Sequence, residues 1–222
     1  MYVNEYFGGI DIYLFDQIQK GRFKEGMKIL DVGCGNGRNM VYFMRNGYDI
    51  YGVEKSQAHI NNVWFLTKQL APDLPDTNFK VENLADISFD DEFFDAVISS
   101  AVLHFAKNTN EFMSWLMESW RVLKVGGFIF VRLASSIGIE DKIKKIEGRR
   151  FSLPDTSERF LVDEQMLMDL TYQLNGELIE PLKTTNVQNV RAMTTWCFKK
   201  LEAPSAEKGG LDSSGGLRLY RD

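Results

Sequence analysis

The most constraining feature of this sequence is a short apolar run followed by three alternating glycines. Residues 27–32 have the composition of a buried β-strand, and residues 38–45 have that of a helix. The connection between them carries Gly33, Gly35 and Gly37. Glycine tolerates positive φ and lets a backbone approach a ligand closely, and open α/β sheets bind ligands at the carboxyl ends of their strands. By itself, this loop fits a dinucleotide site, a nucleoside site or only a tight turn.

Strand-like and helix-like segments alternate beyond this loop. The further expected strands are residues 49–53, 79–81, 94–99 and 128–133. Ser56 and Asn110 have side chains suited to helix N-caps, and they predict helices reaching about residue 70 and residue 123. Such alternation predicts βαβ units, a mainly parallel sheet and helices on both of its faces.

The pattern changes in the last third of the chain. A helix is expected at residues 163–174, followed by strand-like runs at residues 177–187 and 191–200. The short connection at Gln188 and Asn189 predicts an antiparallel hairpin. The predicted fold class is therefore α/β, with a Rossmann-like, seven-stranded, mainly parallel sheet that ends in an antiparallel C-terminal hairpin.

We expect one domain over residues 1–201, because a chain of this length with 44% hydrophobic residues is sufficient for one core. Within it, residues 1–24 read as an aromatic N-terminal helical cap. Residues 135–162 are polar and rich in Lys and Arg, which makes them a candidate lid or a solvated face. Residues 202–222 are rich in Gly, Ser and charge, and we predict a flexible tail there.

A carboxylate ends the second expected strand. Glu54 follows Gly37 by 17 residues. At that position a carboxylate can accept hydrogen bonds from both hydroxyls of a ribose, and it would repel a 2′-phosphate. The alternative is a solvated residue at a strand end. Together, the glycine loop and Glu54 favour a nucleoside ligand.

These motifs resemble those of the class I S-adenosylmethionine-dependent methyltransferases over about residues 25–200. The loop positions that match the family are Asp31, Gly33, Gly35 and Gly37. Phe94 and Asp95 match the pair that begins the family's fourth strand. The Leu-Lys-Pro-Gly-Gly motif before the fifth strand is present with Val125 in place of proline.

The resemblance implies S-adenosylmethionine as cofactor and S-adenosylhomocysteine as product. The cofactor-binding residues that it implies are Asp31, Gly33, Cys34, Gly35, Gly37, Arg38, Asn39, Glu54, Lys55, Asn83, Leu84 and Ser99. Asn83 is expected to accept a hydrogen bond from the adenine amino group, with a simple turn residue as the alternative. The backbone N–H of Leu84 is expected to reach a ring nitrogen.

Methyl transfer needs a base only when the nucleophile must lose a proton. His104, just past the fourth strand, is the candidate catalytic base, and a structural histidine packed beside Phe105 is the alternative. Tyr6, Ser100 and Arg149 are candidate substrate contacts. No metal site is expected, because the sequence lacks Cys and His at metal-ligand spacings.

Short matches around the cofactor residues, among them Arg38 and Asn39, are similar to the tellurite-resistance methyltransferases and their small-molecule relatives. We therefore expect a small-molecule methyl acceptor. A net charge of −5 disfavours a nucleic-acid partner. The alternatives are an RNA or protein methyltransferase and a non-catalytic protein that has kept the fold.

The two cysteines, Cys34 and Cys197, suit a reducing compartment. No secretory signal and no apolar run long enough to cross a bilayer stand out in the sequence. We therefore expect a cytoplasmic protein without membrane association, either a monomer or a homodimer.

Overall fold

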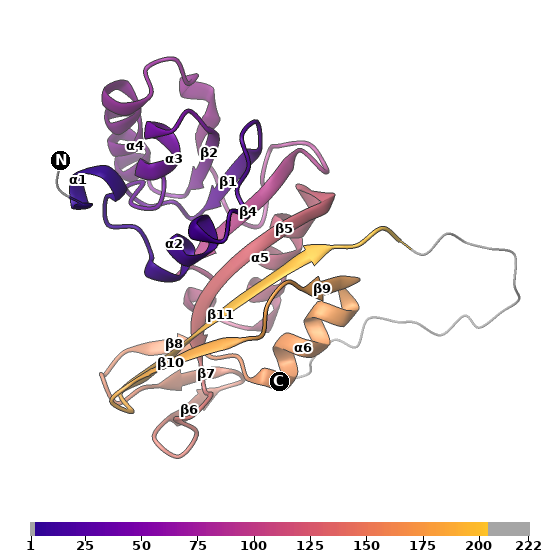
Figure 1. Cartoon of the computed structure of the whole chain (residues 1–222). Helices are drawn as coiled ribbons and strands as arrows, with labels where there is room; N and C mark the ends of the chain where they lie inside the picture. The colour runs from indigo at the N-terminus through magenta and orange to yellow at the C-terminus, as the bar shows by residue number, and fades with distance from the viewer. Residues whose placement is uncertain (1–2, 204–222) are drawn as a thin grey trace, which may run out of the picture.

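A mixed β-sheet forms the centre of the molecule (Figure 1). The structure, a computed structural model, describes residues 3–203. The strands of this sheet are β1 (Lys28–Val32), β2 (Asp49–Glu54), β3 (Phe79–Val81), β4 (Phe94–Ser100), β5 (Leu123–Ser135), β9 (Gly176–Leu178), β10 (Lys183–Val187) and β11 (Arg191–Lys200). Their order is β10-β11-β5-β4-β1-β2-β3, and β9 also pairs with β11.

The strands from β5 to β3 in this order run parallel, and β11 is antiparallel to β5, β9 and β10. This confirms the predicted α/β class, the mainly parallel sheet and the C-terminal hairpin. The hairpin turns at Gln188 and Asn189, both of which have positive φ. The single strand expected over residues 177–187 is instead divided into β9 and β10. Pro181 lies between them and has no N–H to donate to a strand ladder.

Helices cover both faces of the sheet. They are α1 (Val3–Phe7), α2 (Ile12–Gln19), α3 (Val41–Arg45), α4 (Gln57–Leu70), α5 (Thr109–Arg121) and α6 (Glu164–Gln173). Residues of α2, α3 and α4 pack with one face of the sheet around Phe43 and Phe130. Residues of α5 and α6 pack with the other face around Phe112 and Trp196. A separate apolar cluster therefore packs between the helices and each face of the sheet.

The helix starts depend on side-chain caps. Ser56 caps α4 as predicted, since its hydroxyl accepts the N–H of His59. The prediction for α5 was wrong by two residues. Asn108, and not Asn110, accepts the N–H of Glu111. With the helix starting there, Phe112 lies on its buried face. The helix expected from residue 38 begins only at Val41, after a turn.

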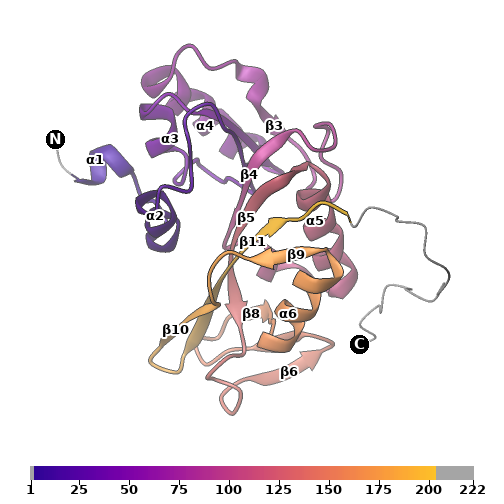
Figure 2. The same ribbon diagram turned by 45° about the vertical axis from the view of Figure 1, so that its right-hand side comes forward.

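The candidate lid at residues 135–162 contains a second, three-stranded antiparallel sheet. Its strands are β6 (Lys144–Glu147), β7 (Arg150–Ser152) and β8 (Glu158–Phe160). Figure 2 shows this sheet beyond the end of β5 and beside the β10–β11 hairpin. Phe160 of β8 stacks on Phe112 of α5, so the small sheet is joined to the main core.

The N-terminal cap consists of two short helices. Gly8, with φ of +64°, separates α1 from α2, and a Cβ there would lie 2.8 Å from Val41. Asp11 caps α2 by accepting the N–H of Tyr13. Of the tail expected at residues 202–222, all but the first two residues lie outside the described part of the chain.

Candidate functional site

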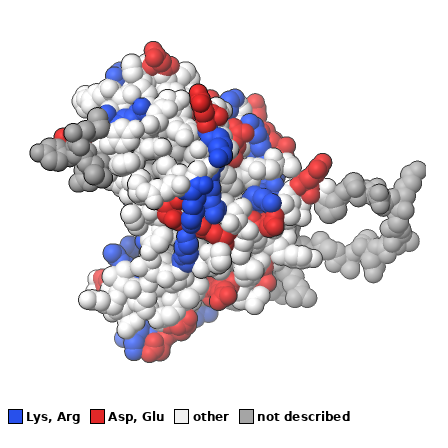
Figure 3. Space-filling view, in the orientation of Figure 1, with Lys and Arg blue, Asp and Glu red and all other residues white. Residues whose placement is uncertain are grey.

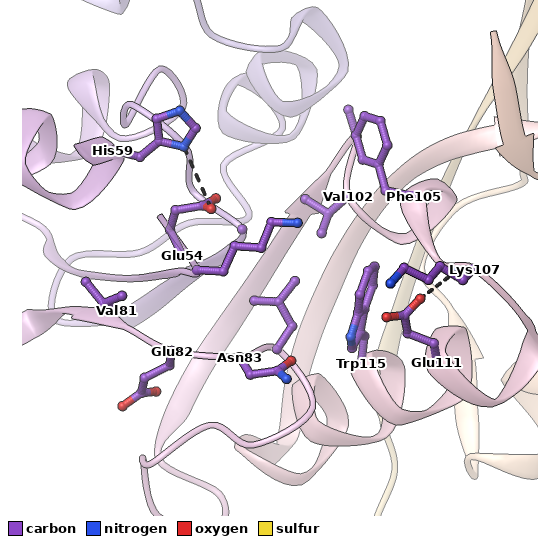
Figure 4. Close-up of a pocket in the computed structure, with 14 residues that line it drawn as sticks. Glu54, His59, Val81, Glu82, Asn83, Val102, Phe105, Lys107, Glu111 and Trp115 are labelled. Atoms are coloured by element: carbon purple, nitrogen blue, oxygen red, sulfur yellow. Dashed lines mark hydrogen bonds and ion pairs between the residues drawn. The ribbon is translucent and has the colours of Figure 1, made fainter. Parts of the chain in front are cut away.

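A cavity of about 700 Å³ opens at the carboxyl ends of the parallel strands (Figure 4). Its walls come from the ends of β2 and β3, the loops that follow β1 to β4, the first turn of α4 and the first two turns of α5. The lining residues are Gly33, Glu54, Lys55, His59, Val81, Glu82, Asn83, Leu84, Ala101, Val102, Phe105, Lys107, Glu111 and Trp115. A cavity of this size is typical of small-molecule and cofactor sites.

The glycine loop forms one edge of this cavity and is fixed to the neighbouring strand. The N–H groups of Gly33 and Cys34 both donate to the carbonyl of Val53, at 2.8 and 3.1 Å. Gly33 has φ of +69°, and a Cβ there would lie 2.8 Å from Val102. At Gly35, with φ of +53°, a Cβ would meet no described atom within 4 Å. The first glycine is therefore required for packing, and the second leaves its backbone open to a ligand.

Glu54 points back at this loop. Its Oε2 accepts the N–H of Gly35 at 3.3 Å, and its Oε1 accepts the N–H of Ser56 at 3.1 Å. Its side chain is only 12% exposed, and it lines the cavity. The carboxylate and the loop are thus in contact with each other and border the same open space, which suits the nucleoside hypothesis.

His59 is partly exposed to solvent, with 45% of its side chain accessible, and it also belongs to the site. It lines the cavity, and its Nδ1 is 3.7 Å from Oε1 of Glu54. Nδ1 is buried and has no hydrogen-bond partner among the described residues. The position could have been anticipated, because His59 lies in the first turn of the helix that follows Glu54.

Asp31 lies under the loop, at the end of β1, and is almost fully buried. Its Oδ2 has no hydrogen-bond partner in the described part of the chain. Burial raises the pKa of this carboxyl to about 7, with the charge of Arg38 lowering it and that of Glu54 raising it further. A buried acid in this state is suited to a cationic partner, because such a partner would replace the missing solvation.

Lys55, Asn83 and Leu84 line the cavity beyond Glu54. The Oδ1 of Asn83 accepts the N–H of Ala85 at 3.1 Å, so the amide oxygen is engaged in a local turn. This contact matches the alternative reading of Asn83 and leaves its adenine role a prediction. Leu84 is buried, so its side chain gives the cavity an apolar surface.

The opposite wall comes from the segment after β4 and from α5, and sequence reasoning missed most of it. Figure 4 shows Phe105, Lys107, Glu111 and Trp115 together on the side away from Glu54. Oε2 of Glu111 accepts the N–H of Lys107 at 2.6 Å. Trp115 contacts the core and also lines the cavity. This wall provides two aromatic surfaces for a planar ligand.

Ala101 directly follows β4, at the turn between these two walls, and has a backbone conformation that is unusual for a residue other than glycine. It has φ of +62°, and its N–H donates to the carbonyl of Arg132 at 2.7 Å. A left-handed alanine costs conformational energy, and such strain is concentrated at ligand sites.

His104 is outside the cavity lining and is buried in a short 3₁₀ helix, η2 (Leu103–Phe105). Its Nδ1 accepts the N–H of Ala134 at 3.1 Å, which leaves the ring proton on Nε2. Burial, together with the charges of Arg159 and Arg132, lowers its pKa to about 3. With Nδ1 occupied and Nε2 protonated, the ring has no free lone pair for a base. The geometry therefore supports the structural alternative, beside Phe105 at 4.5 Å between ring centroids.

The other residues predicted around the cofactor, and the predicted substrate contact Ser100, do not line the cavity and divide into two groups. Arg38 and Ser100 contact each other at 3.2 Å, and the Oδ1 of Asn39 accepts the N–H of Asp11 at 3.0 Å. Cys34, Gly37 and Ser99 are buried. Burial raises the pKa of the Cys34 thiol well above its ordinary value, so the thiol stays protonated and is not a nucleophile.

Two predicted substrate contacts lie elsewhere. The hydroxyl of Tyr6 donates to Oδ1 of Asn46 at 2.8 Å, on the surface of α3. Arg149 pairs with Asp163 at 2.9 Å, at the start of α6. Neither residue lines the cavity, so the structure does not bring them to the candidate site.

Other classes of site receive no support from the described residues. They contain no group of three or more His, Cys, Asp or Glu side chains that could hold a metal ion. No helix among them has the length and apolarity to cross a membrane. Figure 3 shows Lys and Arg interleaved with Asp and Glu across the middle of one face, and not a continuous basic surface.

Comparison with known proteins agrees with this geometry. Residues 30–131 match the family model described as a methyltransferase domain. The human mitochondrial ubiquinone biosynthesis O-methyltransferase is 30% identical over 159 residues, which are 64% of this chain and 42% of that protein. The chain spans less than half the length of the curated relatives it matches.

Solved structures show the same fold. A methyltransferase from Methanosarcina mazei superimposes with a TM-score of 0.68 at 22% identity, over 83% of this chain and 97% of that one. The 1,6-didemethyltoxoflavin-N1-methyltransferase of Burkholderia thailandensis has a TM-score of 0.64 at 14% identity, over 90% of this chain and 85% of that one. That structure contains 1,6-didemethyltoxoflavin and S-adenosylhomocysteine.

Proposed function

The chain belongs to the class I S-adenosylmethionine-dependent methyltransferase family, and we propose that it transfers the methyl group of that cofactor to a small-molecule nucleophile. The observation that carries the proposal is the Glu54 carboxylate, held against the backbone of Gly35 at the edge of an open cavity. The cofactor, when bound, supplies an activated methyl group on a sulfonium centre.

The residues present fit this cofactor. Glu54 has an orientation in which it can accept hydrogen bonds from ribose hydroxyls, and Leu84 and Trp115 supply apolar surface for the adenine. The unpartnered, buried Oδ2 of Asp31 suits the positively charged end of the cofactor. The work of the protein would be to bind, orient and exclude water, which can account for much of the barrier reduction.

Two observations support a small acceptor. The relatives named above include an O-methyltransferase of ubiquinone biosynthesis and an N-methyltransferase with its small substrate bound. The charged side chains on the face in Figure 3 are mixed in sign, unlike a nucleic-acid surface. The cytoplasmic location expected from two buried, free cysteines belongs to the same proposal.

The test has two stages. Calorimetric titration with S-adenosylhomocysteine should show saturable binding, and absence of binding would favour a non-catalytic protein instead. Labelled cofactor is then offered with thiols, phenols and oxyanions, and in parallel with RNA and protein. Transfer to RNA or protein alone would retain the methyltransferase activity and reject the small acceptor.

A further inference from the structure

The sheet order locates the side from which a methyl acceptor must approach. The strand order reverses between β1 and β4, and such switch points are where open α/β sheets hold their ligands. Glu54 and Asn83 follow β2 and β3, so the nucleoside half of the cofactor lies on that side. If the proposed function holds, the reactive methyl group lies over the switch point, and the acceptor reaches it from the side of β4 and β5.

A row of polar side chains crosses the sheet on that side. Ser100 of β4 pairs with Arg132 of β5, and Arg132 pairs with Thr195 of β11. Along β5, Arg132 follows Phe128 and Phe130 at every second position, so it shares their face of the sheet. The same face carries α2, and the polar row therefore lies beneath the N-terminal cap.

Asp11 of the cap holds this row in place. Its Oδ2 accepts the hydroxyl of Ser100 at 2.9 Å and Nη1 of Arg132 at 3.1 Å. Arg38 is 3.9 Å from the same oxygen. The side chain of Asp11 is 1% exposed, and those of Arg132 and Arg38 are 21% and 46% exposed. Two guanidinium groups therefore share one carboxylate, which leaves the cluster with a net positive charge.

Two hydrogen-bonding atoms of the row remain unsatisfied. Nε of Arg132 and Oγ1 of Thr195 are buried and have no hydrogen-bond partner among the described residues. They belong to directly paired positions on neighbouring strands, whose side chains lie on one face. Tyr13 faces the guanidinium of Arg132 at 5.0 Å from its ring centroid. Two donors and an adjacent aromatic ring are an arrangement suited to an oxyanion on a small organic molecule.

We propose that Arg132 and Thr195 bind an anionic group, a carboxylate or a similar oxyanion, of the methyl acceptor. Nε of Arg132 and the hydroxyl of Thr195 donate to this group, and Asp11 holds the guanidinium in position. The acceptor is then a small organic anion. The proposal rests on the proposed function and specifies its substrate class, with the anion bound beside the cavity lining, next to Ser100 at the end of β4.

The test uses the full chain saturated with S-adenosylhomocysteine, with acetate as the probe and acetamide as its uncharged counterpart. The Nε–H resonance of Arg132 is followed by ¹H–¹⁵N NMR and assigned by its loss in Arg132→Met. Acetate should shift this resonance in a saturable way, while acetamide and chloride at equal ionic strength should not. Failure of S-adenosylhomocysteine to bind would count against the proposed function, and not against the anion site.

Three variants separate binding from a merely structural role. Thr195→Val should weaken the acetate response severalfold, and Asp11→Asn should weaken it as well because the charged group that holds the guanidinium in position is removed. Arg150→Met, which removes an arginine paired with Glu158, should leave the response unchanged. An Arg132 resonance unaffected by tens of millimolar acetate in the saturated protein would overturn the proposal, as would an undiminished response in Thr195→Val.

Discussion

At the scale of single residues, Glu54 makes the most direct prediction. Glu54→Gln keeps the size of the side chain and an acceptor for the N–H of Gly35, but it removes the charge. We expect it to weaken S-adenosylhomocysteine binding by about 1–3 kcal/mol, the usual contribution of hydrogen bonds to a charged group. Calorimetry measures the change. Glu177→Gln, on β9 and paired with Lys199, is the matched control and should bind normally.

His104 predicts a pH effect on stability. Its pKa is about 6.5 in the unfolded chain and about 3 in the fold, because burial penalises the charged ring. The unfolded state therefore binds the proton first, and the stabilising contribution present above pH 6.5 is lost as the pH falls toward 3. His104→Asn can still accept the N–H of Ala134 but does not titrate.

The measurement is the free energy of urea unfolding between these two pH values. For each unit by which the pH falls, the free energy of unfolding of the wild-type protein should decrease by about 1.4 kcal/mol more than that of His104→Asn. This difference corresponds to the one extra proton that unfolding binds at His104. Carboxylates common to both proteins cancel in the difference. Parallel pH profiles would mean that the ring is not buried in its neutral form.

The sequence could predict some site residues and not others, according to how local their partners are. Glu54 could be predicted because a strand end and a glycine loop fix its position within a few residues. The role of His104 could not, because its partner is the backbone N–H of Ala134, 30 residues away. Asp11 was missed for the same reason, since its contacts with Ser100 and Arg132 span 89 and 121 residues.

At the scale of elements, the N-terminal cap is joined to the sheet by an ion network around Glu180, in the β9–β10 connection. Its carboxylate contacts Lys20 at 2.6 Å, Arg22 at 3.1 Å and Lys183 at 3.3 Å, and it also accepts Nε2 of Gln17. Burial is the largest effect and would raise the pKa of Glu180, but the hydrogen bonds and charges of Lys20, Lys183 and Arg22 together outweigh it and lower the pKa. This network, with a carboxylate only 7% exposed, fixes α2 on the sheet.

Glu180→Gln should therefore loosen the cap. Because both lysines are more than one-third exposed, solvent screens their attraction to Glu180. We therefore expect the free energy of unfolding to fall by about 1–3 kcal/mol, which is less than the loss on breaking a fully buried ion pair. Chemical unfolding measures it, and added salt should reduce the difference from wild type. Glu158→Gln, at the exposed pair with Arg150, should change stability by less than about 0.5 kcal/mol. Equal effects of the two variants would contradict a specific role for the network.

Elements with a strong hydrophobic pattern were predictable, and those without one were not. The strands β1, β4 and β5 are mostly buried, and their runs of apolar residues are easily recognised in the sequence. All four residues of β6 are exposed, so this strand lacks the alternation that marks a half-buried strand. The start of α5 was placed at Asn110 because two asparagines close together can both cap, and only the burial of Phe112 selects Asn108.

At the scale of the whole molecule, the walls of the site come from both halves of the sheet. The glycine loop, Glu54 and Asn83 belong to the half of the sheet from β1 to β3, while Trp115 and the segment after β4 belong to the other half. A ligand that contacts both walls stabilises only the folded arrangement, so its binding free energy is added to the free energy of unfolding. The whole fold, and not one loop, should then respond to the cofactor.

S-adenosylhomocysteine at 100 times its dissociation constant should add about 2.7 kcal/mol of stability. For a domain of this length, this corresponds to a rise in Tm of roughly 5–10 °C. Differential scanning calorimetry of the wild-type protein and of Glu54→Gln at the same ligand concentration measures it, and the variant should show a clearly smaller rise. Adenine alone should give little stabilisation, because it lacks the ribose that Glu54 is placed to bind. Equal rises for the wild type and Glu54→Gln would show that the ligand binds without this carboxylate, and the nucleoside site would then have to lie elsewhere in the molecule.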